Sequence, residues 1–224
     1  MGRGYPAIWS TLLSLPFFIA GGYAYLVSPE RFQIPGASIT SSDLQLIAVS
    51  LALFGVFIFV IGLYVQFAAP PSPSLQEDET IIEERTPSQR VAFSKGILSV
   101  PFFAATLYLL YYTLLPYVYP TTTFLLGLYF FSTGIKTYWV NILTQYIATS
   151  KRIISEYRFI SLRRQEIPIN KIRGVEERKS ILETFAGLGN IRIASGGVGG
   201  SVQLNIRNIE DSSIFANKLR ELVD

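Results

Sequence analysis

The chain has 224 residues, half of them hydrophobic and only 16% charged, whereas charged residues make up about 25% of a typical soluble domain. It contains no cysteine and no histidine, which excludes disulfide frameworks, Cys/His zinc sites and catalytic triads built on histidine or cysteine. A mean hydropathy of +0.36 and a pI near 9.1 are typical of a membrane protein with basic surfaces.

Three long segments lack any Asp, Glu, Lys or Arg: residues 4–29, 44–76 and 97–135. A helix that crosses the hydrocarbon core needs about 20 apolar residues, and uncharged runs longer than about 18 residues favour lipid over a soluble core. Each of the first two segments is long enough for one membrane-spanning helix, and the third is long enough for two.

Prolines and segment lengths predict where the helices lie. The first is expected over residues 6–27, with Pro6 in its first turn, and the second over residues 44–68. The third segment divides at residues 116–120, Pro-Tyr-Val-Tyr-Pro. The first apolar run exceeds the 7–15 residues typical of a signal peptide, so we interpret it as a retained helix. The sequence thus predicts four transmembrane α-helices in two hairpins.

The positions of lysine and arginine predict an orientation, because cationic residues accumulate on the cytoplasmic side. The first hairpin loop has only Arg31 and the second has none, whereas Arg85, Arg90 and Lys95 lie between the hairpins and many more follow the fourth helix. We expect a multi-pass protein of the cell membrane, with its N-terminus, linker and C-terminal domain in the cytoplasm. The spans lack ionisable residues apart from Lys136 near one end, which argues against a transporter.

The two expected hairpins resemble each other in sequence. Ser-Leu-Pro-Phe-Phe-Ile-Ala at residues 14–20 is echoed by Ser-Val-Pro-Phe-Phe-Ala-Ala at residues 99–105. Two glycine pairs with equal spacing follow in the second and fourth helices: Gly55 with Gly62, and Gly127 with Gly134. An internal duplication explains this pattern, and chance similarity between apolar segments is the alternative.

Composition divides the chain into four regions. Residues 70–96 begin with Pro-Pro-Ser-Pro-Ser and continue with an acidic stretch, which is typical of an extended, partly disordered linker. The predicted organisation is transmembrane hairpin 1 (1–69), a cytoplasmic Pro/acidic linker (70–96), transmembrane hairpin 2 (97–140) and a C-terminal domain (141–224).

The C-terminal region has the period-two alternation of half-buried strands. Apolar and polar residues alternate around Tyr157 and Phe159, around Ile191 and Ile193, and from Val202 to Ile206. The glycine-rich residues 195–201 are expected to form a hairpin loop, because a strand follows them and they lack the lysine of a phosphate-binding loop. Pro168 is expected at a strand edge or end.

A helix is expected to close the chain. Asp211 is the candidate N-cap. The apolar face of this helix is predicted from residues at helical spacing: Ile214, Phe215, Leu219 and Leu222.

A series of motifs recurs in order through this region: Tyr146-Ile-Ala-Thr149, Arg152-Ile153, Ile167-Pro168-Ile169, Gly187-Leu-Gly189 and Ile191-Arg-Ile193. The series resembles the bacterial pleckstrin-homology-like (PH-like) domains of prokaryotic membrane proteins, over roughly residues 77–223. The resemblance implies a β-sandwich or barrel of antiparallel strands capped by one α-helix, following a transmembrane hairpin. It implies no enzymatic activity, and a shared fold does not carry over lipid binding.

The C-terminal domain holds 13 of the 19 cationic and 9 of the 16 acidic residues, a net charge of +4. A cation near an anionic leaflet contributes about 1 kcal/mol to binding. Lys151 and Arg152 closely follow the fourth expected helix, so we expect them near the bilayer. The candidate anionic-surface residues are Lys151, Arg152, Arg158, Arg163, Arg164, Lys171 and Arg173. A solvated face with the positive-inside signal is the alternative.

These features predict a non-enzymatic membrane protein that presents a PH-like domain for protein or membrane-surface binding, as a scaffold or accessory subunit. The alternatives are a lipid-acting membrane enzyme and an anionic-lipid sensor. We expect no catalytic residues, no cofactor and no metal site. The expected partners are the lipid bilayer, its anionic head groups, and a protein partner or a second copy of the chain, but not nucleic acid.

Overall fold

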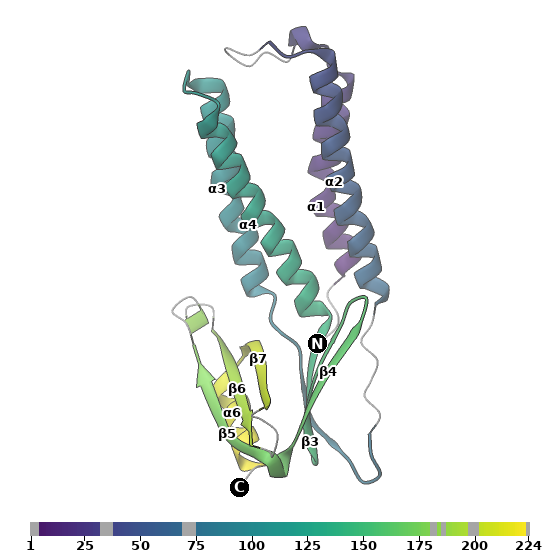
Figure 1. Cartoon of the computed structure of the whole chain (residues 1–224), viewed down its shortest axis with the longest axis vertical. Helices are drawn as coiled ribbons and strands as arrows, with labels where there is room; N and C mark the ends of the chain where they lie inside the picture. Colours follow the sequence, from purple (N-terminus) through teal and green to yellow (C-terminus); the bar gives the residue numbers. More distant parts are fainter. Residues whose placement is uncertain are drawn as a thin grey trace. The chain divides into compact units, whose positions relative to one another are not determined.

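The computed structural model describes residues 5–31, 38–68, 75–179, 183–184, 187–196 and 202–222 (Figure 1). The chain divides into two compact units. The helical unit comprises Met1–Phe67 and Ser94–Ile135, and the sheet unit comprises Ala68–Phe93 and Lys136–Asp224.

Long helices form mostly in the regions that lack charge. They are α1 (Pro6–Leu26), α2 (Ser41–Phe67), α3 (Arg90–Tyr112) and α4 (Val118–Ile142), with a short 3-10 turn η1 (Pro29–Arg31) after α1. The helical unit contains these helices except for the start of α3 and the end of α4, which belong to the sheet unit. Pro6 lies in the first turn of α1 as predicted. Three of the helices, α1, α2 and α3, are long and apolar enough to cross a membrane. The fourth, α4, forms over 25 residues in the expected region but is not among these three.

Glycines in α2 and α4 have similar packing contacts with the Pro-Phe-Phe segments of α1 and α3. One glycine in each pair packs against both phenylalanines of a Pro-Phe-Phe motif: Gly55 against Phe17 and Phe18, and Gly127 against Phe102 and Phe103. The serine that begins each motif is buried and donates to the carbonyl three residues earlier, Ser14 to Thr11 at 2.8 Å and Ser99 to Gly96 at 2.6 Å. The similarity in sequence therefore corresponds to equivalent helix–helix contacts.

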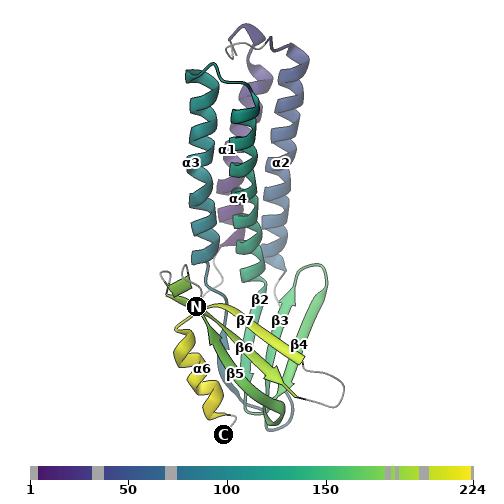
Figure 2. The same cartoon turned by 60° about the vertical axis from the view of Figure 1, so that its left-hand side comes forward.

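In the part of the chain that the structure describes, the sheet unit is built from a four-stranded and a three-stranded antiparallel sheet and a C-terminal helix (Figure 2). The four-stranded sheet has the order β1 (Ile81–Arg85), β2 (Thr144–Thr149), β3 (Arg152–Arg158) and β4 (Leu162–Pro168). A 3-10 turn, η2 (Ile169–Lys171), leads into the three-stranded sheet of β5 (Ile172–Arg178), β6 (Leu188–Ser195) and β7 (Val202–Glu210), and α6 (Ser212–Glu221) follows. Pro168 ends the edge strand β4, as predicted.

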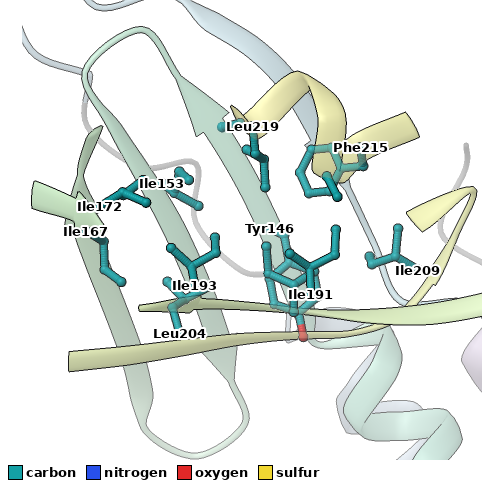
Figure 3. Packing of buried hydrophobic residues seen from close by; sticks show 13 residues of the cluster. Tyr146, Ile153, Ile167, Ile172, Ile191, Ile193, Leu204, Ile209, Phe215 and Leu219 are labelled. Carbon is teal, nitrogen blue, oxygen red and sulfur yellow. The ribbon is translucent and has the colours of Figure 1, made fainter. Parts of the chain in front are cut away.

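The core of this unit lies between the two sheets and α6 (Figure 3). Its buried side chains come from both sheets, such as Ile153 and Ile193, and from one face of α6, where Phe215 and Leu219 are almost completely buried. Such a two-layer arrangement closed by a helix agrees with the architecture that the PH-like resemblance implies.

Two expectations for α6 need correction. Ile214 is 58% exposed, because the buried face of α6 runs through Phe215, Ala216 and Leu219 instead. Asp211 does precede the helix, but its side chain makes no capping hydrogen bond. Its backbone is left-handed, with φ of 51°, whereas side-chain N-capping requires an extended backbone.

Part of the segment expected to be a linker is an integral strand. The strand β1 pairs with β2, with Arg85 opposite Tyr146, and α3 begins at Arg90, inside the predicted linker. An edge strand tolerates the charged residues of β1 because one side of it stays solvated. The acidic residues that predict a linker therefore belong to an edge strand of the sheet. The sheet unit accordingly begins well before residue 141. The glycine-rich loop expected at residues 195–201 lies mostly outside the described residues.

Candidate functional site

The seven basic residues predicted to bind an anionic surface lie at both ends of the four-stranded sheet. The strand β2 starts two residues after α4 ends and carries the chain about 20 Å away along its length, so Lys151 and Arg152 lie at the end of the sheet far from α4. The strand β3 returns, and the backbone N–H of Arg158 donates to the carbonyl of Leu143 at 3.1 Å. We call these the distal end and the helix-proximal end.

The distal end holds four of the seven residues. Lys151 and Arg152 begin β3, and the backbone N–H of Ile169 donates to the carbonyl of Lys151 at 3.0 Å, which places Lys171 and Arg173 at this end as well. Lys151 and Arg152 are therefore not close to the end of α4, contrary to expectation, because β2 separates them from it.

Arg152 forms an internal ion-pair network. Its guanidinium contacts Glu79 at 2.9 Å and Glu166 at 2.6 Å, and Thr149 donates to Glu79 at 2.7 Å. The Glu79 side chain is fully buried. Its hydrogen bond with Arg152 lowers the pKa of Glu79 to about 2. Arg152 therefore neutralises a buried carboxylate, and its charge is directed into the fold.

Arg164 is paired in a similar way. It lies opposite Glu156 in the β3–β4 ladder and its Nε contacts Oε1 of Glu156, whose side chain is fully buried. Burying a carboxylate requires a paired cation. Two of the seven predicted residues, Arg152 and Arg164, thus serve the fold.

The remaining cations are exposed at opposite ends of the sheet. Lys151, Lys171 and Arg173 are exposed at the distal end, where the Lys151 ammonium donates to the carbonyl of Glu77 at 2.6 Å. Arg158 and Arg163 are exposed at the helix-proximal end, on either side of the β3–β4 turn.

The β3–β4 turn has an exposed apolar tip that the sequence analysis missed. Ile160 is 86% exposed and Leu162 is 48% exposed. The alternation around Phe159 was interpreted as a continuing strand, but β3 ends at Arg158. The sequence does contain a signal for this tip: two apolar residues lie on either side of Ser161, and Arg158 and Arg163 flank them.

A second basic surface lies on the outer face of the three-stranded sheet. Arg192 faces Asn205 across the β6–β7 ladder. Its Nη2 donates to Gln203 at 2.6 Å, and its Nε is buried with no hydrogen-bond partner among the described residues. A pocket of about 260 Å³ is lined by Arg178, Asn190, Ile191, Arg192, Asn205 and Arg207. Alternation on β6 and β7 could have placed Arg192, Asn205 and Arg207 together on the outer face.

Several carboxylates of the sheet unit, among them Glu79, Glu83 and Glu177, are engaged in structural contacts. Burial raises the pKa of Glu83, but hydrogen bonds from Lys218 and Arg85 outweigh burial and lower it. Glu177 behaves alike, since hydrogen bonds from Ser212 and its neighbours outweigh the effect of burial on its pKa. General acids that work near neutral pH need a raised carboxyl pKa. Within the described ranges, no group of three or more acidic side chains could hold a metal ion.

Comparison with known proteins agrees with this architecture. The family model described as Bacterial PH domain matches residues 96–223, which begin in α3 and extend beyond the last described turn of α6; β1 precedes the match. No curated protein and no solved structure matches the chain. The matched range covers more than half of the sequence and joins the sheets to α4 and to most of α3, which is long and apolar enough to cross a membrane. The chain therefore belongs to the bacterial PH domain family.

Proposed function

We propose that this chain is a non-enzymatic multi-pass membrane protein whose four helices cross the cell membrane. Its PH-like domain lies in the cytoplasm and binds a protein partner or the membrane surface, as a scaffold or accessory subunit. The pairing of β1 with β2 is the observation that carries the proposal.

Pairing of β1 with β2 supports four spans. Arg85 lies opposite Tyr146, so the chain leaves one sheet into α3 and re-enters the same sheet from α4. A chain that crosses the bilayer through α3 must return to the same side to complete this ladder. With 25 residues, α4 is about 37 Å long, which exceeds the roughly 30 Å of the hydrocarbon core. We infer that α4 is the returning span although it is not among the three helices that length and composition alone identify as candidate spans.

The distribution of cations supports a cytoplasmic sheet unit. Arg85 ends β1, Arg90 and Lys95 lie at the start of α3, and Lys136 lies near the end of α4. The α3–α4 loop, by contrast, contains no cation. Cationic residues beside a span favour the cytoplasmic face.

The side-chain chemistry supports binding over catalysis. The chain has no cysteine or histidine, and Glu79, Glu83 and Glu177 have lowered pKa values through their structural hydrogen bonds. An anionic-lipid sensor is a second candidate, favoured by the arginines beside the exposed apolar tip of the β3–β4 turn.

Single-cysteine labelling tests the topology, because the native chain offers no competing thiol. Asn170→Cys places a thiol at the exposed distal end, and Leu114→Cys places one in the α3–α4 loop, where Leu114 is 90% exposed. A membrane-impermeant maleimide is expected to label residue 114 in intact cells and residue 170 only in inverted vesicles. Labelling of both from one side would contradict the four-span topology.

Affinity purification of the full chain from detergent extracts tests the binding role. A stoichiometric protein partner, lost when exposed residues of the sheet unit are substituted, is expected for a scaffold or accessory subunit. Purification of the chain alone, together with turnover of a lipid substrate, would contradict the non-enzymatic proposal.

A further inference from the structure

The turn between β3 and β4 combines exposed apolar and cationic side chains. Ile160 is 86% exposed and Leu162 is 48% exposed, and the exposed Arg158 and Arg163 lie directly beside them. Apolar side chains at a projecting tip, with arginine around them, are the residue types that bind at an anionic lipid interface. There the apolar groups enter the headgroup boundary and the cations contact phosphate.

The register of the sheet places this tip back alongside the last turns of α4. Tyr157 lies opposite Thr144, so Ile160, three residues further, extends about 10 Å back beyond the start of β2. From Thr144 to Lys136, α4 and its exit residues span about 12 Å. The tip therefore reaches back toward the level of Lys136, the first charge after the uncharged residues 97–135. Every residue used here from 136 onward belongs to the sheet unit.

We propose that the β3–β4 turn docks into the headgroup layer of the leaflet that α4 enters, with Ile160 and Leu162 inserted and Arg158 and Arg163 contacting anionic lipid. The proposal rests on the proposed function, because it requires α4 to span the bilayer. It assigns lipid contact to the helix-proximal cations and excludes the distal Lys151, Lys171 and Arg173, which face away from the end of α4.

Fluorescence quenching in the full chain tests the insertion. Ser161→Cys, labelled with an environment-sensitive dye, leaves Ile160 and Leu162 in place, and Asn170→Cys is the matched control at the distal end. In nanodiscs that contain anionic lipid, a nitroxide placed on the upper acyl chain is expected to quench the dye at residue 161 and not at residue 170. Equal quenching at both positions would overturn the proposal. So would a blue-shifted but unquenched dye at residue 161, which would indicate a protein partner or a second copy.

Two further variants test the chemistry of the contact. Ile160→Asn is expected to abolish quenching at residue 161. Arg163→Gln is expected to lower the ratio of docked to undocked turn about fivefold, since one cation near an anionic surface contributes about 1 kcal/mol. Lys171→Gln removes an equal charge at the distal end and is expected to have no effect. Equal quenching in neutral and anionic nanodiscs would overturn the role of the arginines.

The outcome is separable from that of the topology experiment. If residue 170 is labelled only from the cytoplasmic side but residue 161 is not quenched, the docking proposal fails while the proposed function stands. If residues 114 and 170 are labelled from the same side, the four-span proposal fails, and docking as described here fails with it.

Discussion

The Arg152 guanidinium donates two hydrogen bonds to the Glu79 carboxylate, from Nε to Oε1 at 2.9 Å and from Nη2 to Oε2 at 3.0 Å. The two residues are 73 positions apart, and the whole α3–α4 hairpin lies between them in the sequence. This ion pair, with the β1–β2 ladder beside it, joins the segments before and after the hairpin into one folded unit.

Removing the charge of Glu79 is expected to destabilise the sheet unit. Glu79→Gln leaves a buried amide opposite Arg152, and loss of this charged hydrogen bond costs about 1–3 kcal/mol. The urea midpoint of the sheet unit, followed by emission of the buried Trp139 in a Trp9→Phe background, is expected to fall. Glu77→Gln is the matched control, because Glu77 is exposed. Equal midpoints for the two variants would refute a structural role for this pair.

Stability of the sheet unit is expected to decrease in acid. The pKa of Glu79 is lowered from 4.5 to about 2, so the unfolded state binds more protons than the folded state between these values. The contribution of Glu79 is fully present above about pH 4.5 and is lost as pH falls toward 2. The urea midpoint is expected to decline over this range, and the decline is expected to be shallower in Glu79→Gln. Parallel pH profiles would argue against this assignment.

Gly62 is expected to be intolerant of any side chain. A Cβ at this position of α2 would overlap Cβ and Oγ of Ser10 in α1, whereas a Cβ at Gly22 meets nothing within 4 Å. Gly62→Ala is expected to lower the thermal unfolding midpoint in detergent, at a cost of about 1–3 kcal/mol. Gly22→Ala is expected to be neutral or stabilising, because alanine favours a helix over glycine.

A rescue experiment makes the Gly62 prediction specific. Ser10→Gly removes the overlapping atoms, so the Ser10→Gly/Gly62→Ala double variant is expected to recover most of the lost stability. If the two substitutions are simply additive, close packing between Ser10 and Gly62 is not the cause.

Asn141 is expected to stabilise the sheet unit at the place where α3 begins and α4 ends. Its Nδ2 donates to the Ser88 carbonyl at 2.9 Å, and Ser88 in turn bonds Asn208 through its N–H at 2.7 Å. Asn141 is only 5% exposed, so Asn141→Leu leaves a carbonyl without its donor and is expected to cost about 1–3 kcal/mol. The Trp139 urea midpoint measures this loss, and Asn170→Leu at an exposed position is the control. A midpoint unchanged by Asn141→Leu would show that water replaces the amide.

The sequence alone determined the long helices and most of the strands. Long apolar runs without charge favour membrane-spanning helices, so the predicted bounds of α1 agree with the structure within one residue and those of α2 within three. Period-two alternation located β6 and β7, and the ordered motifs indicated the PH-like domain. These features could be predicted because they depend on residues that are close together in the sequence.

Tertiary structure decided what depends on distant partners. Residues 81–85 form a strand because they pair with β2, which follows two helices later in the sequence. The acidic residues Glu83 and Glu84 made this segment resemble a linker instead. The cations from Lys151 to Arg173 are close in sequence, but the antiparallel β3–β4 hairpin sends Lys151 and Arg163 to opposite ends of a sheet. Pairing with Glu79 and Glu156 turned Arg152 and Arg164 into structural residues. Composition counts charges, but only the fold determines which of them face a buried carboxylate and which face solvent.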